Sequence, residues 1–207
     1  MKYESIILDI DGTLWDSRAL VAEGYNIHLE KVGLSHLFVT AEDLKPLFGK
    51  VMTEIADHIL ATIPVETRYD LMEAIMETEN QYLHDNPCHI GYPGVQETIA
   101  KLAENHRLFI VSNSQCGYPE LCINKLGLAP YIEGHLCFGD TGTSKGKTIR
   151  TLMEKYNIES CVYVGDIQGD YEATVEAGIP FIWCSYGFGT VDSYVAKVDK
   201  FEDLLKL

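Results

Sequence analysis

After residue 92 the sequence alternates short apolar runs with amphipathic segments, and this alternation constrains the fold more than any other feature. The expected strands are Leu108–Val111, His135–Phe138, Cys161–Val164 and Phe181–Cys184. Helical patterns begin near Pro93, Gly117, Gly146 and Asp170. Strands that alternate with helices predict a parallel sheet covered by helices on both faces. We therefore expect an α/β fold with a doubly wound parallel sheet, a Rossmann-like core.

One more strand is expected near the N-terminus, and a helical block separates it from the others. Tyr3–Ile10 is a short apolar run that ends in Asp-Gly, which is typical of a buried strand. Between residues 17 and 87 apolar side chains recur at helical spacing without a strand pattern. The expected organisation is a core of residues 1–16 and 88–207, interrupted by an all-helical domain at 17–87.

Within the helical block, local patterns indicate where helices begin and which sides they bury. Thr40–Asp43 resembles a capping box, which marks the start of a helix. Leu47–Val51 joins two helical segments and contains Gly49, whose backbone adopts shapes that other residues resist. The residues expected to line one side of a long helix are Val65, Tyr69, Met72, Met76 and Leu83.

The charge composition limits the partners. Sixteen Lys and Arg against 31 Asp and Glu give a net charge of −15. Binding to nucleic acid or acidic lipid needs a basic surface, so we expect neither a nucleic acid nor a membrane as partner. A small anionic substrate remains possible because a bound cation reverses the local field. The oligomeric state stays open.

Cysteines and targeting signals suggest a soluble, reduced, cytoplasmic protein. No C-x-x-C pair or compact Cys/His array occurs, so the spacing indicates neither a zinc site nor a dithiol motif. The N-terminal apolar run is too short for a signal peptide. The longest uncharged stretch, Ala177–Val191, contains Pro180 and falls short of the ~20 residues of a membrane span. The cysteines are Cys88, Cys116, Cys122, Cys137, Cys161 and Cys184.

Polar side chains follow the expected strands at their carboxyl ends, where open parallel sheets bind ligands. Carboxylates crowded at one edge repel one another unless a cation lies among them, and hard oxygen ligands select Mg²⁺. The sequence therefore predicts a magnesium site there. The residues concerned are Asp9, Asp11 and Thr13 after the first strand, Ser112 and Asn113 after the second, Lys145 before a helix, and Asp166 and Asp170 after the fourth strand.

In this order, these residues resemble the four motifs of the haloacid dehalogenase superfamily. Tyr92–Val95 resembles the return from a helical cap in the phosphoglycolate phosphatase-like branch, and the resemblance spans the whole chain. It implies a doubly wound core whose inserted cap, residues 17–87, closes over the site. It also implies a Mg²⁺-dependent phosphatase, a phosphoric monoester hydrolase acting on a small phosphorylated metabolite through an aspartyl-phosphate.

The resemblance also implies roles for the catalytic residues. Asp9 is the expected nucleophile, and Asp11 the general acid and base that serves the leaving oxygen and the attacking water. Ser112 and Lys145 are expected to hold the transferring phosphoryl oxygens. Lys147, two residues further on, is a rival for the role of Lys145.

Further roles follow for the metal and the substrate. The implied Mg²⁺ ligands are Asp9 and Asp166 by side chain and Asp11 by its carbonyl, with Asp170 in support. Asp170 has an alternative reading as a simple helix cap. Thr13 and Asn113 are expected to orient the substrate, and Lys50 to meet a charged group on its leaving portion.

Other functions place their own requirements on the same residues. Residues 142–148 approach a P-loop, but three residues rather than four separate the glycines. A receiver domain would need an acidic pair before a later acceptor Asp and would have no helical insertion. A dehalogenase of this fold would lack Asp11. A sugar-phosphate mutase, a pyrophosphatase and a nucleotidase remain alternatives because the same core residues serve them.

Overall fold

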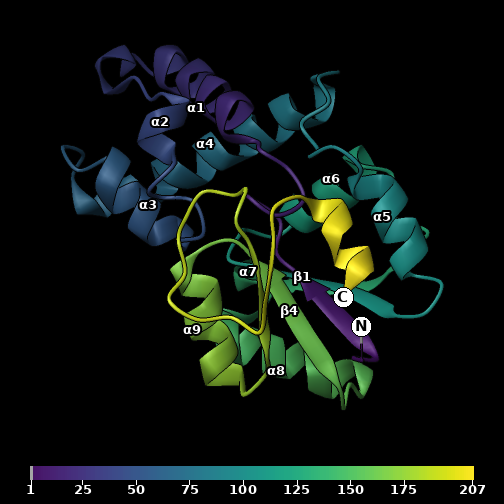
Figure 1. Cartoon of the computed structure of the whole chain (residues 1–207). Helices are drawn as coiled ribbons and strands as arrows, with labels where there is room; N and C mark the ends of the chain where they lie inside the picture. Colours follow the sequence, from purple (N-terminus) through teal and green to yellow (C-terminus); the bar gives the residue numbers. More distant parts are fainter. Residues whose placement is uncertain (1) are drawn as a thin grey trace. The chain divides into compact units, whose positions relative to one another are not determined.

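The computed structural model describes residues 2–207 and divides them into two compact units, which we call the core unit and the helical unit (Figure 1). The core unit contains the chain up to Asp16 together with Ile90–Leu207, and the helical unit is Ser17–His89. Cys88 and His89 therefore lie with the helical unit. Within residues 2–207, no helix has the length and apolar character that crossing a membrane requires.

The core unit is built on a six-stranded sheet in the order β3-β2-β1-β4-β5-β6, and each neighbouring pair is parallel. This confirms the expected doubly wound α/β fold. Leu8 lies opposite Ile110 on one side and Val164 on the other, so the carboxyl ends of β1, β2 and β4 lie at the same edge of the sheet. The strands are β1 Ser5–Leu8, β2 Arg107–Ser112, β3 Ile132–Cys137, β4 Cys161–Gly165, β5 Phe181–Cys184 and β6 Ala196–Val198.

Helices cover both faces of this sheet (Figure 1). On one face, Ile7, Phe109 and Tyr163 form an apolar core with residues of α8 and α9. On the other face α5 packs against the C-terminal η2. Because a parallel sheet is covered on both sides, its central strands are apolar at consecutive positions. The helical segments of the core unit are α5 Val95–Leu102, α6 Tyr118–Lys125, α7 Phe138–Thr141, α8 Lys145–Tyr156, α9 Gln168–Ala177 and η2 Phe201–Lys206.

Two sheet elements differ from the sequence-based expectation. β3 starts three residues earlier than expected and ends at Cys137, because Phe138 opens the short helix α7. β3 is an edge strand, so its exposed Glu133 breaks the apolar pattern by which the inner strands are recognised. The last strand, β6, was not predicted, since three residues give too short a pattern.

The helical unit contains no strand among its described residues, as the spacing predicted. The capping box at Thr40 is confirmed: Thr40 Oγ1 accepts a 3.2 Å bond from the Asp43 amide, and Asp43 Oδ2 accepts a 2.9 Å bond from the Thr40 amide. The helical segments are α1 Arg18–Lys31, η1 Ser35–Leu37, α2 Ala41–Leu44, α3 Met52–Ile59 and α4 Val65–Asp85.

The buried stripe of α4 was only partly predicted. Met72 and Leu83 are buried as expected, whereas Val65 and Tyr69 are exposed. Val65 is the first residue of the helix, and Tyr69 turns its hydroxyl to Asp57 Oδ1 at 3.0 Å. The buried positions of α4 are Met72, Ile75, Glu79 and Leu83, at steps of three and four residues.

The close packing of α1 against α4 yields a stability prediction. A Cβ atom at Gly24 would lie 2.9 Å from the Glu79 Cα, so the two backbones meet where no side chain fits. We expect Gly24→Val to lower the free energy of unfolding by about 1–3 kcal/mol, the cost of overpacking. The exposed Ala19 of the same helix provides the control, since Ala19→Val should stay within about 0.5 kcal/mol of the wild type. Chemical denaturation measures both, and equal effects would contradict the packing.

Candidate active site

A buried lysine joins two of the predicted acidic residues beyond the carboxyl edge of the sheet. Lys145, the first residue of α8, donates hydrogen bonds of 2.7 Å to Asp9 Oδ1 and 2.6 Å to Asp170 Oδ1. All three side chains are buried. Asp9 directly follows β1, and its amide continues the sheet by donating to the Val164 carbonyl at 2.9 Å. The rival Lys147 is exposed on α8, so Lys145 is the lysine that lies in the site.

Asp170 performs two structural tasks. Its Oδ1 receives Lys145, while its Oδ2 accepts the backbone amides of Asp166 at 3.0 Å and Ile167 at 3.2 Å. The carboxylate therefore closes the turn from β4 into α9 and also holds the lysine. Both oxygens of Asp170 already accept hydrogen bonds. Asp170 is therefore better suited to hold the neighbouring groups of a cation site in place than to bind the cation directly.

Asp9 and Asp166 each keep one oxygen without a hydrogen bond from residues 2–207, Oδ2 of Asp9 and Oδ1 of Asp166. The other oxygens are held: Asp166 Oδ2 accepts the Phe188 amide at 2.6 Å, and the Tyr163 hydroxyl lies 3.3 Å from Asp9 Oδ1. Carboxylate oxygens of Asp9, Asp166 and Asp170 lie within 4.8 Å of one another. This acidic trio offers hard oxygen donors at the spacing of one bound cation.

The charges of the trio are unbalanced. Burial raises the pKa of Asp9 to about 7, with repulsion from Asp170 adding to the effect and Lys145 opposing it. Burial, followed by repulsion from Asp170 and Asp9, raises the pKa of Asp166 well above its usual range. Although burial opposes it, attraction to these carboxylates holds the pKa of Lys145 well above its usual value, so Lys145 is cationic. One ammonium facing three buried carboxylates leaves room for a further positive charge.

Two glycines bring the backbone against Asp166. A Cβ atom at Gly12, whose φ is +78°, would lie 2.0 Å from Asp166 Oδ2. A Cβ atom at Gly187 would lie 2.4 Å from the same oxygen. The loops after β1 and β5 therefore enclose Asp166 from two sides, and the Tyr186 hydroxyl ties them together by donating to the Thr13 carbonyl at 2.7 Å.

Asp11 lies outside the acidic trio and has its own partners. Its Oδ1 accepts the Trp15 indole N–H at 2.8 Å and the Tyr118 hydroxyl at 2.9 Å. The two aromatic rings meet edge to face with centroids 5.6 Å apart. Trp15 belongs to the loop after β1, and Tyr118 begins α6, so two separate elements fix the orientation of this carboxylate.

The remaining predicted residues occupy different positions. Ser112 ends β2, is buried, and its Oγ accepts the Ser114 amide at 3.3 Å. Asn113 follows it and is half-buried. Thr13 is fully buried, and its Oγ1 has no hydrogen-bond partner among the described residues. Lys50 belongs to the helical unit, where it is exposed between α2 and α3.

Several residues of the site were missed by the sequence analysis. Their pattern gives little warning: Trp15 and Tyr118 are aromatic residues near motif positions, and Tyr163 lies within an apolar strand. The loop after β5 carries no recognisable motif, yet its Gly187 and Phe188 contact Asp166. Among these residues, only Trp15 could have been suspected from the sequence, because it follows Asp11 by four residues.

Comparison with known proteins identifies the family of the chain. The model of the haloacid dehalogenase-like hydrolase family matches residues 6–184. A phosphoglycolate phosphatase of Cupriavidus necator is 27% identical over 193 residues, which cover 89% of this chain and 81% of that protein. A 5'-nucleotidase of Pseudomonas aeruginosa is 23% identical over 208 residues, covering 93% of this chain and 87% of that protein.

The fold has counterparts among solved structures. The crystal structure of a predicted phosphoglycolate phosphatase from Haemophilus somnus superposes with a TM-score of 0.83, at 21% identity, and covers 100% of this chain and 98% of the other. The fold and the acidic site define a hydrolase with a doubly wound core. The chain belongs to the haloacid dehalogenase-like hydrolase family.

The raised pKa of Asp9 gives a pH prediction for the metal-free protein. The pKa of the Asp9 carboxyl is 3.8 for the unperturbed group, which represents the unfolded chain, and about 7 in the folded protein. The folded state therefore binds this proton more tightly. The stability it contributes is therefore present below pH 3.8 and is lost as the pH rises toward 7. In excess chelator, the wild-type unfolding free energy relative to Asp9→Asn should fall over this range.

Thermal denaturation at several pH values measures this difference. The exposed Asp192 provides a control, because Asp192→Asn removes a carboxylate that lies outside the site. A difference between wild type and Asp9→Asn that stays flat or rises with pH would contradict the assignment.

Proposed function

We propose that this phosphoric monoester hydrolase is a Mg²⁺-dependent phosphatase that hydrolyses a small phosphomonoester through an aspartyl-phosphate at Asp9. The observation that carries the proposal is the environment of Asp9. One of its oxygens is held by Lys145, and the other has no hydrogen bond from residues 2–207. A carboxylate that is buried, anchored through one oxygen and open at the other is suited to attack phosphorus.

Two chemical steps follow from the proposal. In the first, Asp9 Oδ2 bonds to phosphorus while the bond to the leaving oxygen breaks, and Asp11 gives that oxygen a proton. In the second, Asp11 takes a proton from a water that attacks the phosphorus, which releases orthophosphate and restores Asp9. The bonds from Trp15 and Tyr118 orient Asp11 for both transfers.

Donors in the site support binding of the phosphoryl group. The Lys145 ammonium, which Asp9 and Asp170 hold in place, supplies positive charge for a phosphoryl oxygen. The Ser112 hydroxyl lies at the same edge of the sheet and supplies a further donor. Thr13, two residues after Asp11, and Asn113, which follows Ser112, are proposed to orient the substrate. Such donors stabilise charge that develops on the transferring group.

The acidic trio fits Mg²⁺ because its donors are hard oxygens and its charge is unbalanced. Asp166 would hold the ion by its free oxygen and Asp9 by the carboxylate oxygen that does not attack phosphorus, Asp11 would add its carbonyl, and Asp170 would support the site. When bound, the ion supplies positive charge that balances the phosphoryl oxygens.

The proposed substrate is a small phosphorylated metabolite, and a carboxylated one such as 2-phosphoglycolate is the first candidate. The support is the phosphoglycolate phosphatase among the relatives. Nucleoside monophosphates are the second candidate class, because a 5'-nucleotidase is also among the relatives. A phosphate-release screen over both classes, pyrophosphate and hexose 1-phosphates distinguishes these activities from the mutase alternative. The cytoplasm is the proposed compartment, because all six cysteines are free thiols.

The first functional prediction concerns the nucleophile and the ion. Asp9→Asn keeps the shape of the side chain but removes its nucleophilic charge, so turnover should fall by ~10³-fold or more. Excess chelator should abolish wild-type phosphate release, and added Mg²⁺ should restore it. Asp192→Asn, outside the site, should retain normal turnover. Undiminished activity of Asp9→Asn, or full activity in chelator, would contradict the proposal.

A second functional prediction concerns the helical unit, which we propose acts as a cap that sets specificity. Lys50 follows Gly49 in the exposed link between α2 and α3. Lys50→Ala should lower kcat/KM for the physiological substrate by about tenfold, because the attraction between an ammonium and a charged substrate group is stronger where water is excluded. The same substitution should leave kcat/KM for a generic aryl phosphate unchanged. The exposed Lys45 of the same unit is the matched control. Equal losses on both substrates would show that Lys50 does not discriminate.

A further inference from the structure

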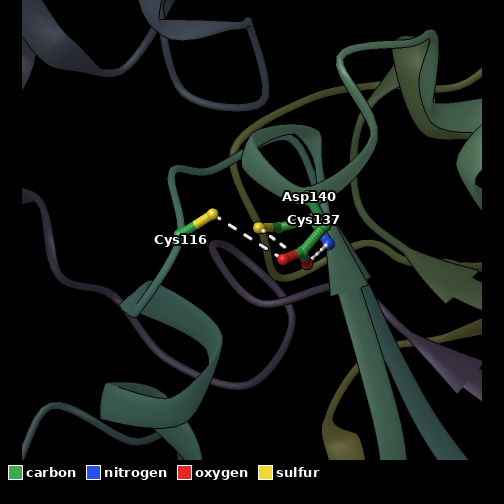
Figure 2. Close-up of side chains that lie close together, drawn as sticks. All are labelled: Cys116, Cys137 and Asp140. Atoms are coloured by element: carbon green, nitrogen blue, oxygen red, sulfur yellow. Dashed lines mark hydrogen bonds between the residues drawn. The ribbon is translucent and has the colours of Figure 1, made fainter.

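Two cysteines and an aspartate converge at the carboxyl edge of the sheet. They come from three different elements, and none of them belongs to the acidic trio. Figure 2 shows Cys116 in the loop before α6, Cys137 at the end of β3 and Asp140 in α7, with both sulfurs turned toward the carboxylate. Asp140 Oδ1 lies 3.6 Å from Cys116 Sγ, and Asp140 Oδ2 lies 3.2 Å from Cys137 Sγ. One ligand atom from each residue lies within 4.8 Å of the others.

The backbone holds this cluster together before any ligand binds. A Cβ atom at Gly139 would lie 2.5 Å from the Cys116 amide nitrogen and 2.8 Å from its sulfur, so the two loops touch where only glycine fits. The Gly139 amide donates to the Ser114 carbonyl at 3.1 Å. The Cys137 amide donates to Asp140 Oδ2 at 2.8 Å and fixes the carboxylate. The donors are therefore already assembled.

The three ligand atoms lie close enough together to be gathered by one thiophilic cation. With Zn–S near 2.3 Å and Zn–O near 2.0 Å, tetrahedral geometry separates sulfur from oxygen by roughly 3.5 Å and two sulfurs by roughly 3.8 Å. The observed S···O distances are 3.6 Å from Cys116 Sγ to Asp140 Oδ1 and 3.2 Å from Cys137 Sγ to Asp140 Oδ2. Binding of one ion would therefore require the side chains to rotate until both sulfurs face the same carboxylate oxygen.

The charges also suit a cation. Although burial opposes it, hydrogen bonds from the Cys137 amide and the two thiols lower the pKa of Asp140, so it is ionised. Among residues 2–207 it forms no ion pair with a lysine or arginine. Burial, and then the bond to Asp140, raises the pKa of Cys137 to about 12, which keeps the thiol protonated until a metal displaces the proton. Cys116 and Asp140 are exposed, which gives the ion a path of entry.

We propose that Cys116, Cys137 and Asp140 form a second metal site, one that binds a thiophilic divalent cation such as Zn²⁺ with solvent completing the tetrahedron. The two sites divide by chemistry, because thiolates select zinc-like ions and the all-oxygen trio selects Mg²⁺. Each bound ion replaces two S–H protons by two metal–sulfur bonds and releases two protons to solvent. The ion would tie the loop between Ser112 and Tyr118 to the end of β3.

Cobalt substitution tests the proposal without relying on activity. Co²⁺ is titrated into the full chain in saturating Mg²⁺ and a non-thiol reductant, and thiolate-to-cobalt charge-transfer absorption is recorded. This band requires sulfur ligands, so an ion in the acidic trio does not produce it. We expect one equivalent of Co²⁺ to produce the band and Zn²⁺ to displace it, with about two protons released per ion.

Matched variants locate the site. Cys116→Ser removes one of the two thiolates, so it should lower the intensity of the band at saturation by about half. It should also weaken Zn²⁺ binding by at least about tenfold, because loss even of an outer partner of a metal ligand has an effect of this size. Asp140→Asn should also weaken Zn²⁺ binding. The control is Cys88→Ser, which replaces an exposed cysteine of the helical unit and should leave Zn²⁺ binding unchanged. Both test positions are exposed, so these variants are expected to fold. Absence of the band in the wild type, or a band of unchanged intensity and affinity in Cys116→Ser, would overturn the proposal.

Discussion

Lys145 bridges Asp9 and Asp170 where β1, α8 and α9 meet, and the arrangement of the acidic site depends on this buried ion pair. Removing one partner of such a pair leaves an uncompensated charge, which typically costs about 3–5 kcal/mol. The pair also sets which oxygen of Asp9 is occupied and which remains open. The same contact therefore serves stability and the proposed chemistry, and it explains why Lys145 is buried when most lysines are not.

The parallel sheet explains how residues far apart in the sequence reach this pair. Its strands are parallel, so the residues that follow β1, β2 and β4 meet at one edge. The same edge places Cys137, the last residue of β3, beside the end of β2. One topological feature thus generates an oxygen-rich cluster near its centre and a sulfur-containing cluster at the β3 side. Their donors differ, and so do the cations they fit.

The sequence predicted the doubly wound fold and the gathering of Asp9, Lys145, Asp166 and Asp170, because buried strands and strand-end acids leave strong local patterns. It did not predict partners that depend on tertiary packing. Tyr118 reaches Asp11, and Phe188 reaches Asp166, across long separations in the chain that no periodicity encodes. The cysteine spacing likewise indicated no metal site, since Cys116 and Cys137 meet only through β2–β3 pairing and α7. The edge strand β3 was predicted with the wrong bounds because Glu133 breaks its apolar pattern, and the edge strand β6 was missed because it has only three residues.

The central claim is that Asp9 carries the phosphoryl group during turnover, and trapping that acyl phosphate tests it most directly. The enzyme is mixed with excess substrate and Mg²⁺, quenched in acid within the first turnovers, and treated with borohydride, which reduces an aspartyl-phosphate to homoserine. Peptide mass spectrometry then reads the N-terminal segment. The account predicts homoserine at position 9, dependent on substrate and on Mg²⁺. An unaltered Asp9 under conditions where phosphate is released, or reduction at another carboxylate, would contradict it.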